Sequence, residues 1–117
     1  MTKKNILDIH SLKQLLGNDT EICKEILIEF VKTTEDTWNI VKDALSLGDY
    51  TLAKFQLHKI LGSCSSIFAE ELKVNIHRAG QLILTGSYTK ETFILVIDSI
   101  ESSLNNLKGE IEYFCKY

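Results

Sequence analysis

Proline is absent from this chain of 117 residues, and glycine occurs only six times. Proline removes a backbone donor and breaks helix interiors, so a chain without proline is suited to long helices. Glycine followed by polar residues, a pattern that ends one helix and caps the next, occurs in three short segments: LLGNDT at 15–20, SLGDY at 46–50 and LTGSYT at 84–89. Together these features predict long helices joined by short turns.

Long hydrophobic runs are also missing. The longest run is only a few residues, such as FILVI at 93–97, whereas a membrane-spanning helix needs about 20 residues. The basic pair near the N-terminus is not followed by an apolar core, so we see no secretory signal. The net charge is −3 with interleaved acids and bases, which is unlike the basic patch of a nucleic-acid binder. We expect one cytoplasmic domain over residues 1–117, without nucleic-acid binding or membrane insertion.

Metal-ligating patterns are absent as well. The chain has no C-x-x-C pair and no Cys/His ligand spacing, which argues against a zinc site; its cysteines are Cys23, Cys64 and Cys115. A diiron bundle would place glutamate three residues before a histidine, but those positions hold Leu7, Phe55 and Val74. Free cysteines fit the reducing cytoplasm. We therefore expect no metal and no cofactor bound by this chain.

Apolar residues recur every three or four positions in four long segments, which is the spacing of amphipathic helices. The segments cover 20–47, 49 to beyond 67, 72–83 and 93–111, and a short leading helix is expected over 8–16. Period-two alternation is absent over any useful length, so strands are not expected. Short connections make neighbouring helices antiparallel. The sequence thus predicts an all-α fold, an antiparallel up-and-down four-helix bundle with a short extra N-terminal helix.

The predicted core follows from the same spacing. Its members are Ile9, Leu12, Leu15, Leu16, Cys23, Ile26, Leu27, Phe30, Val31, Thr34, Trp38, Val41, Leu45, Ala53, Leu57, Ile60, Cys64, Ile67, Leu72, Ile76, Ala79, Ile83, Phe93, Val96, Ile97, Ile100, Leu104, Leu107 and Ile111. Trp38 and Phe30 are interpreted as core side chains rather than a ligand-binding pair, and Cys64 as a small buried apolar residue.

His58 falls in the middle of the second long helix, on the side away from its predicted core positions. Gly62 lies one turn further on the same face, although glycine costs a helix about 1 kcal/mol relative to alanine. Bare backbone beside an exposed imidazole lets another protein approach closely. A neutral, exposed imidazole can attack phosphorus through a ring nitrogen. Because no acid, base or glycine-rich phosphate loop is placed to assist, a partner would have to complete the chemistry.

The other two histidines lack such surroundings. His10 in the leading helix is predicted to lie at the surface. His77 follows the core position Ile76 and is predicted to lie at the boundary of the core.

The segment LHKILGSCSSIFA, residues 57–69, resembles the signature of histidine-containing phosphotransfer (HPt) domains. His58 matches the phosphorylated histidine, Gly62 the glycine four residues later, and Ala69 the closing alanine. The resemblance extends over nearly the whole chain, through LDIHSLKQLLGND at 7–19, ALSLGDYTLAKFQLH at 44–58 and LILTGSY at 82–88. Three positions depart from the family pattern: Leu61 replaces the usual lysine, Phe68 a usual glycine, and Gly80 a frequent glutamate.

The resemblance implies a phosphorelay carrier that accepts a phosphoryl group on His58 from a receiver-domain aspartate and passes it to another receiver. The partners would be response-regulator receiver domains, with a hybrid sensor histidine kinase as a further candidate. The receiver would supply Mg²⁺, and the chain would have no kinase or hydrolase activity of its own. The candidate docking residues are Lys54, Phe55, Lys59, Leu61, Gly62 and Ser65. Ser63 is either a small boundary residue or a phosphate ligand.

Two other interpretations remain open from the residues. The chain could be a non-phosphorylated helical adaptor or inhibitor that binds a receiver or a histidine kinase. This interpretation is favoured by Leu61, which stands where the HPt signature has lysine. It could also be a helical adaptor unrelated to phosphorelays, although the local match would then be a coincidence. Lys54 and Lys59 are the candidates to replace the missing lysine charge.

Overall fold

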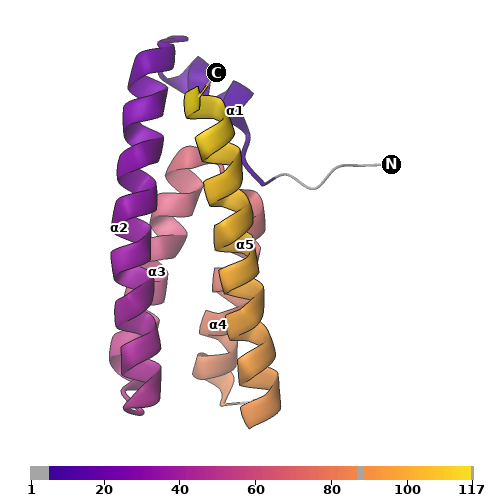
Figure 1. Cartoon of the computed structure of the whole chain (residues 1–117). Helices are drawn as coiled ribbons and strands as arrows, with labels where there is room; N and C mark the ends of the chain where they lie inside the picture. Colours follow the sequence, from indigo (N-terminus) through magenta and orange to yellow (C-terminus); the bar gives the residue numbers. More distant parts are fainter. Residues whose placement is uncertain (1–5, 87–88, 117) are drawn as a thin grey trace.

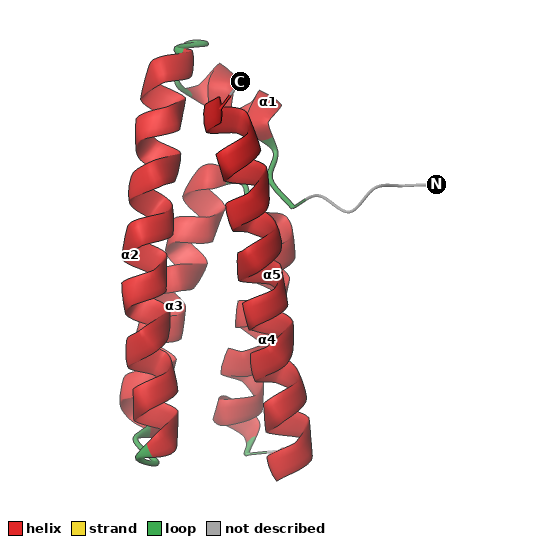
Figure 2. Cartoon of the chain, viewed as in Figure 1, coloured by secondary structure: helices red, strands yellow, loops and turns green. Residues whose placement is uncertain are grey.

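The computed structural model of the chain describes residues 6–86 and 89–116. Five helices account for most of these residues, and no strand occurs among them (Figures 1 and 2). The helices are α1 (Ile9–Leu15), α2 (Thr20–Ser46), α3 (Tyr50–Ile67), α4 (Glu70–Thr85) and α5 (Lys90–Lys116). The predicted all-helical class is confirmed. The predicted turn at 84–89 includes residues 87 and 88, which lie outside the described residues.

Aspartates begin three of the helices. In each case the carboxylate accepts a hydrogen bond of 3.1 Å from the backbone N–H three residues later, in the pairs Asp8–Ser11, Asp19–Ile22 and Asp49–Leu52. These bonds satisfy one of the backbone donors that the first turn of a helix leaves unpaired. Gly48, just before Asp49, has a φ of 75°, a left-handed conformation that glycine adopts without a side-chain clash. The turn predicted at 46–50, in which a glycine ends one helix and a polar residue caps the next, is therefore confirmed at the α2–α3 connection.

The end of α3 is less regular. Phe68 takes the left-handed conformation there, with a φ of 62°, where a glycine would avoid the steric cost of a Cβ. Its carbonyl oxygen accepts a 3.1 Å hydrogen bond from the backbone N–H of Asp8, which ties the start of α1 to the α3–α4 turn. Phe68, which stands where the HPt signature has a glycine, thus lies at a position where glycine would relieve the backbone strain.

The four long helices pack in a ring. In this ring α2 packs on α3, α3 on α4, α4 on α5, and α5 on α2, while the short α1 contacts α2 at one end (Figure 1). The C-terminal end of α5 lies at the same end of the molecule as α1, and the α2–α3 turn lies at the opposite end (Figure 2). This order of contacts is the one expected when consecutive helices run up and down.

Most predicted core residues are buried between these helices. The buried apolar side chains include Leu12, Leu27, Trp38, Val41, Leu57, Ile60, Leu72, Ile76, Ile100 and Leu107. The prediction is wrong for Leu15, which is 66% exposed because α1 is short and presents only one side to the other helices. Several other predicted positions are only partly buried: Ile9, Leu16, Ile26, Val31, Leu45, Ile83, Phe93 and Ile97. Two polar residues, Gln56 and Ser103, are buried although their polarity did not suggest it.

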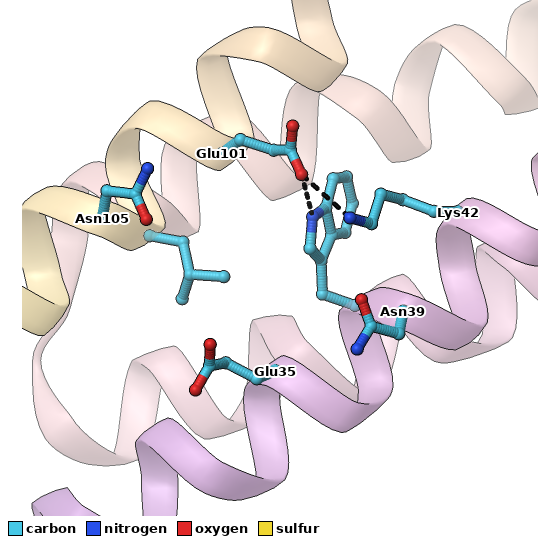
Figure 3. Close-up of a pocket in the computed structure, with 7 residues that line it drawn as sticks. Glu35, Asn39, Lys42, Glu101 and Asn105 are labelled. Carbon is cyan, nitrogen blue, oxygen red and sulfur yellow. Dashed lines mark hydrogen bonds and ion pairs between the residues drawn. The ribbon is translucent and has the colours of Figure 1, made fainter.

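A polar cluster joins α2 to α5. The indole N–H of Trp38 donates to the Glu101 carboxylate at 3.2 Å, and the Lys42 ammonium contacts the same oxygen at 3.0 Å (Figure 3). The hydrogen bonds from Lys42 and Trp38 lower the pKa of Glu101 from its ordinary value. Trp38 is only 3% exposed, so the prediction that it is a core side chain is confirmed, and its one polar atom is satisfied at the edge of the core.

Membrane insertion was not expected from the sequence. Among the helices of the described residues, none is both long and apolar enough to cross a bilayer.

The Glu101 contacts predict a pH-dependent contribution to stability. The folded-state pKa is lowered below the ordinary value of 4.5, so the carboxylate stabilises the fold above that pH. The stabilisation is lost as the pH falls through the lower folded-state pKa. Glu101→Gln should lower the free energy of unfolding at pH 7 by about 1 kcal/mol or less, because the pair is partly solvated, and the deficit should shrink toward pH 3. Urea unfolding of the variant and the wild type at pH 7 and pH 3 measures this difference in the free energy of unfolding.

The exposed Glu112, also in α5, provides the control for that experiment. Glu112→Gln should change stability little at either pH. A Glu101→Gln deficit of the same size at pH 7 and pH 3 would contradict the assignment.

Candidate functional site

His58 is exposed midway along α3, as the sequence predicted. The opposite side of α3 is buried, including Ala53, Leu57, Ile60 and Cys64, so packing fixes the face on which the imidazole lies. The imidazole makes no hydrogen bond or ion pair with any other residue in the described part of the chain. An exposed ring on a rigid helix, without a partner in the described part of the chain, is accessible to an incoming group.

A groove of roughly 650 Å³ runs between α3 and α4, and His58 is part of its lining. The α3 wall also contains three of the predicted docking residues, Lys54, Phe55 and Leu61. The α4 wall contributes His77, Gly80, Gln81 and Leu84. The candidate nucleophile is therefore at the edge of a hollow between two helices, rather than on an isolated convex surface.

The remaining predicted docking residues, Lys59, Gly62 and Ser65, are exposed on α3 but do not line the groove. The Lys59 ammonium lies 5.7 Å from the centre of the Phe55 ring, which is within the range of a cation–π contact. Phe55 itself is 61% exposed, so an apolar ring and a positive charge occur together next to His58. Lys59, a candidate to replace the missing lysine charge, therefore lies over an aromatic ring and outside the groove.

The serines after Gly62 bond back to their own helix. The Ser63 hydroxyl donates to the Lys59 carbonyl, and the Ser65 hydroxyl to the Leu61 carbonyl, both at 3.2 Å. Ser63 is partly buried, which agrees with a boundary residue. Both hydroxyls use their single proton within the helix.

His77 is the residue that sequence reasoning misplaced. It was predicted to lie at the core boundary, but it is exposed and lines the same groove as His58. The groove-facing residues of α4 are spaced as one helix face: His77, Gly80, Gln81 and Leu84. That spacing was visible in the sequence, but only the packing of α4 on α3 shows which face meets His58. His10 is exposed, as predicted.

Acidic residues are missing around His58. The chain carries 16 Asp and Glu residues, yet α3 contains none, and α4 has them only in its first turn, at Glu70 and Glu71. No carboxylate lines the groove within the described residues, whereas the Lys54 ammonium does. In a protein with net charge −3, this face is thus locally neutral to positive and suited to an anion.

The buried thiol on α3 is not part of the site. Cys64 is fully buried, and burial raises the pKa of its thiol to about 12, so the reactive thiolate is suppressed at neutral pH. The prediction of a small apolar core residue is confirmed. Among the described residues, no group of three or more His, Cys, Asp or Glu side chains could hold a metal ion.

The chain is similar to a short part of two bacterial sensor proteins. The chain is 26% identical over 110 residues to the sensor protein EvgS of Escherichia coli K12, and the match covers 94% of this chain. The corresponding protein of Escherichia coli O157:H7 matches equally, with 26% identity over 110 residues. The match spans only 9% of the length of each of these relatives. No family model matches the chain, and no solved structure matches it.

The environment of Gly62 leads to a stability prediction. A Cβ added there would meet no atom within 4 Å, so packing inside the protein does not require glycine at this position. Gly62→Ala should raise the free energy of unfolding by about 0.5–1 kcal/mol, because alanine is the better helix former. Thermal or urea unfolding, followed by circular dichroism, measures the change.

Gly48→Ala is the matched control. Its backbone is left-handed, so the same substitution should destabilise the protein there despite the open space. A loss of stability in Gly62→Ala would mean that glycine at 62 serves the fold.

Proposed function

We propose that the chain is an HPt-type phosphorelay carrier, with α2–α5 as an antiparallel four-helix bundle and His58 as the phosphoacceptor. The observation that carries the proposal is the exposed, unpaired imidazole in the middle of α3, on a face without carboxylates. The sequence resemblance around His58 supports it. The similarity of the chain to part of a sensor protein also supports a role in signalling.

The transfer step needs only one nucleophile from this chain. A lone pair on a neutral ring nitrogen of His58, expected to be Nε2, forms a bond to phosphorus while the P–O bond to a receiver aspartate breaks. The carboxylate leaves with the electron pair, and the imidazole keeps its proton on the other nitrogen. No further atom is gained or lost. The reverse step passes the group to a second receiver.

Positioning and charge neutralisation dominate such transfers. The receiver would supply the aspartate, a lysine and Mg²⁺, while this chain supplies the imidazole and the docking surface. Gly62 leaves open space beside the nucleophile, and Phe55 and Leu61 offer apolar contact. With no ATP-binding motif, the chain is proposed to act as a carrier in the cytoplasm rather than as a kinase.

One observation favours the second candidate, a non-phosphorylated adaptor. Leu61 supplies no charge where HPt domains usually have lysine, and it packs partly against the core. Such an adaptor would bind a receiver or kinase through the same face without accepting phosphate.

His58→Gln separates the two functions. The variant should fold normally, because His58 is exposed, yet it should accept no label from a receiver carrying radioactive phosphoaspartate. Acid-labile, alkali-stable label on the wild-type chain is the measurement, since phosphohistidine has that stability. His10→Gln is the control and should accept label like the wild type. Label that persists in His58→Gln would overturn the assignment of His58 as the phosphoacceptor, and label that never appears on the wild type would favour the adaptor.

Gly62→Glu tests the docking surface. The added bulk and negative charge should slow transfer at least tenfold, or about 1.4 kcal/mol, through weaker receiver association. Gly109→Glu is the matched control, because a side chain at Gly109 in α5 also meets no atom within 4 Å. Single-turnover transfer rates at increasing receiver concentration distinguish weaker docking from slower chemistry. Equal rates for both glutamate variants would refute the role of Gly62.

A further inference from the structure

We propose that the groove between α3 and α4 is a phosphoryl-binding subsite, in which His77 and Lys54 donate N–H groups to the oxygens of a phosphoryl group on His58. This inference rests on the proposed function in that His58 must be the modified residue. It goes further by giving a binding role to His77, which lies on a different helix from the nucleophile.

The charge of the groove favours a dianion. Lys54 is the only fully charged side chain in the described lining, and no carboxylate opposes it. A phosphoryl group attached to His58 would add roughly two negative charges at the mouth of the groove. Donors that face it across a partly enclosed space interact more strongly than the same donors in open water.

The donors are available. The side chains of Lys54, His77 and Gln81 make no hydrogen bond or ion pair with other residues in the ranges 6–86 and 89–116. An imidazole has at least one N–H in either protonation state, and an ammonium has three. Since these groups have no partner inside the protein, binding a phosphoryl oxygen would not break an existing interaction.

The space is available as well. Gly80 lines the groove from α4, and a Cβ built there would meet no atom within 4 Å. The α4 wall therefore has a gap between His77 and Leu84, bordered by the amide of Gln81. Glycine at position 80 therefore places no side chain in the groove that would oppose a phosphoryl group on His58.

The subsite also accounts for Leu61. An apolar side chain at that position cannot neutralise charge, but it lines the groove and packs on the core. The neutralising donors would then come from one turn earlier on α3, at Lys54, and from the facing helix, at His77.

Phosphoramidate tests the subsite without a receiver. The imidazole lone pair forms an N–P bond while the N–P bond of phosphoramidate breaks, and ammonia leaves with the electron pair from the form whose nitrogen is already protonated. Mass spectrometry locates the modified histidine, and ³¹P NMR follows its hydrolysis. Hydrogen bonds from these donors to the phosphoryl oxygens stabilise the dianion on His58 before water attacks it. Losing one should therefore shorten the half-life of phosphorylated His58.

The decisive variant is His77→Leu, made together with His10→Gln to remove another exposed histidine. The half-life should fall about threefold to tenfold, as expected for one net hydrogen bond in a groove open to solvent. His77→Lys should restore it, because lysine again supplies a donor. Arg78→Leu is the matched control, since Arg78 is the adjacent exposed cation on α4 but does not line this groove. Circular dichroism checks that each variant is folded.

A second pair of variants tests α3 in the same way. Lys54→Met should shorten the half-life, whereas Lys59→Met should not, because Lys59 lies over Phe55 outside the groove. In addition, the ring ¹⁵N signals of His77 should shift when His58 is phosphorylated, which a purely structural role would not produce.

The outcomes separate this inference from the proposed function. Half-lives unchanged in His77→Leu and Lys54→Met would overturn the subsite, even if receivers transfer phosphate normally. Shortened half-lives with rescue by His77→Lys would support the subsite, even if no receiver transfers phosphate to the chain. Failure of phosphoramidate to modify His58 would overturn the subsite as well.

Discussion

The burial of one side of α3 is the constraint on which the site depends. Leu57, Ile60 and Cys64 are almost completely buried, and α3 is held between α2 and α4. A helix packed on two neighbours has one free strip, and His58 lies on it. The orientation of the imidazole is therefore set by apolar packing on the far side of the same helix, not by a hydrogen bond to the ring. This leaves the imidazole on a rigid helix and without a hydrogen-bond or ion-pair partner among the described residues.

Helical periodicity made the fold predictable, because each long helix buries one stripe of apolar residues and exposes the other. The helix starts were also legible, since Asp19 and Asp49 cap them through their own side chains. The errors arose where one helix had to be placed against another. Leu15 fits the helical period but has no neighbour to cover it, and His77 lies next to a core residue yet faces the groove. A helical-wheel projection of one helix contains no information on how the next helix is rotated about its own axis.

The same limit explains which parts of the candidate site could be predicted from the sequence and which could not. The exposure of His58 and the open position of Gly62 follow from α3 alone, so the sequence predicted both. The groove needs two helices, so its α4 wall was not predicted. One signal in the sequence could have indicated it: α3 has no acidic residue, and α4 has none beyond its first turn, in a chain that is acidic overall. Negative charge that is missing from α3 and from most of α4 indicates a shared surface before the packing of the two helices is known.

The functional interpretation of Leu61 depends on both walls of the groove. On α3 alone, an apolar residue in place of lysine is the strongest reason to favour a passive adaptor. In the folded protein Leu61 packs against the core and lines the groove beside His58, where Lys54 and His77 provide N–H donors. Electrostatic help for a phosphoryl group depends on where donors lie in space, not on which residue of the helix bears them. An adaptor has no need of free donors around an unpaired imidazole, whereas a carrier does, and this favours the carrier.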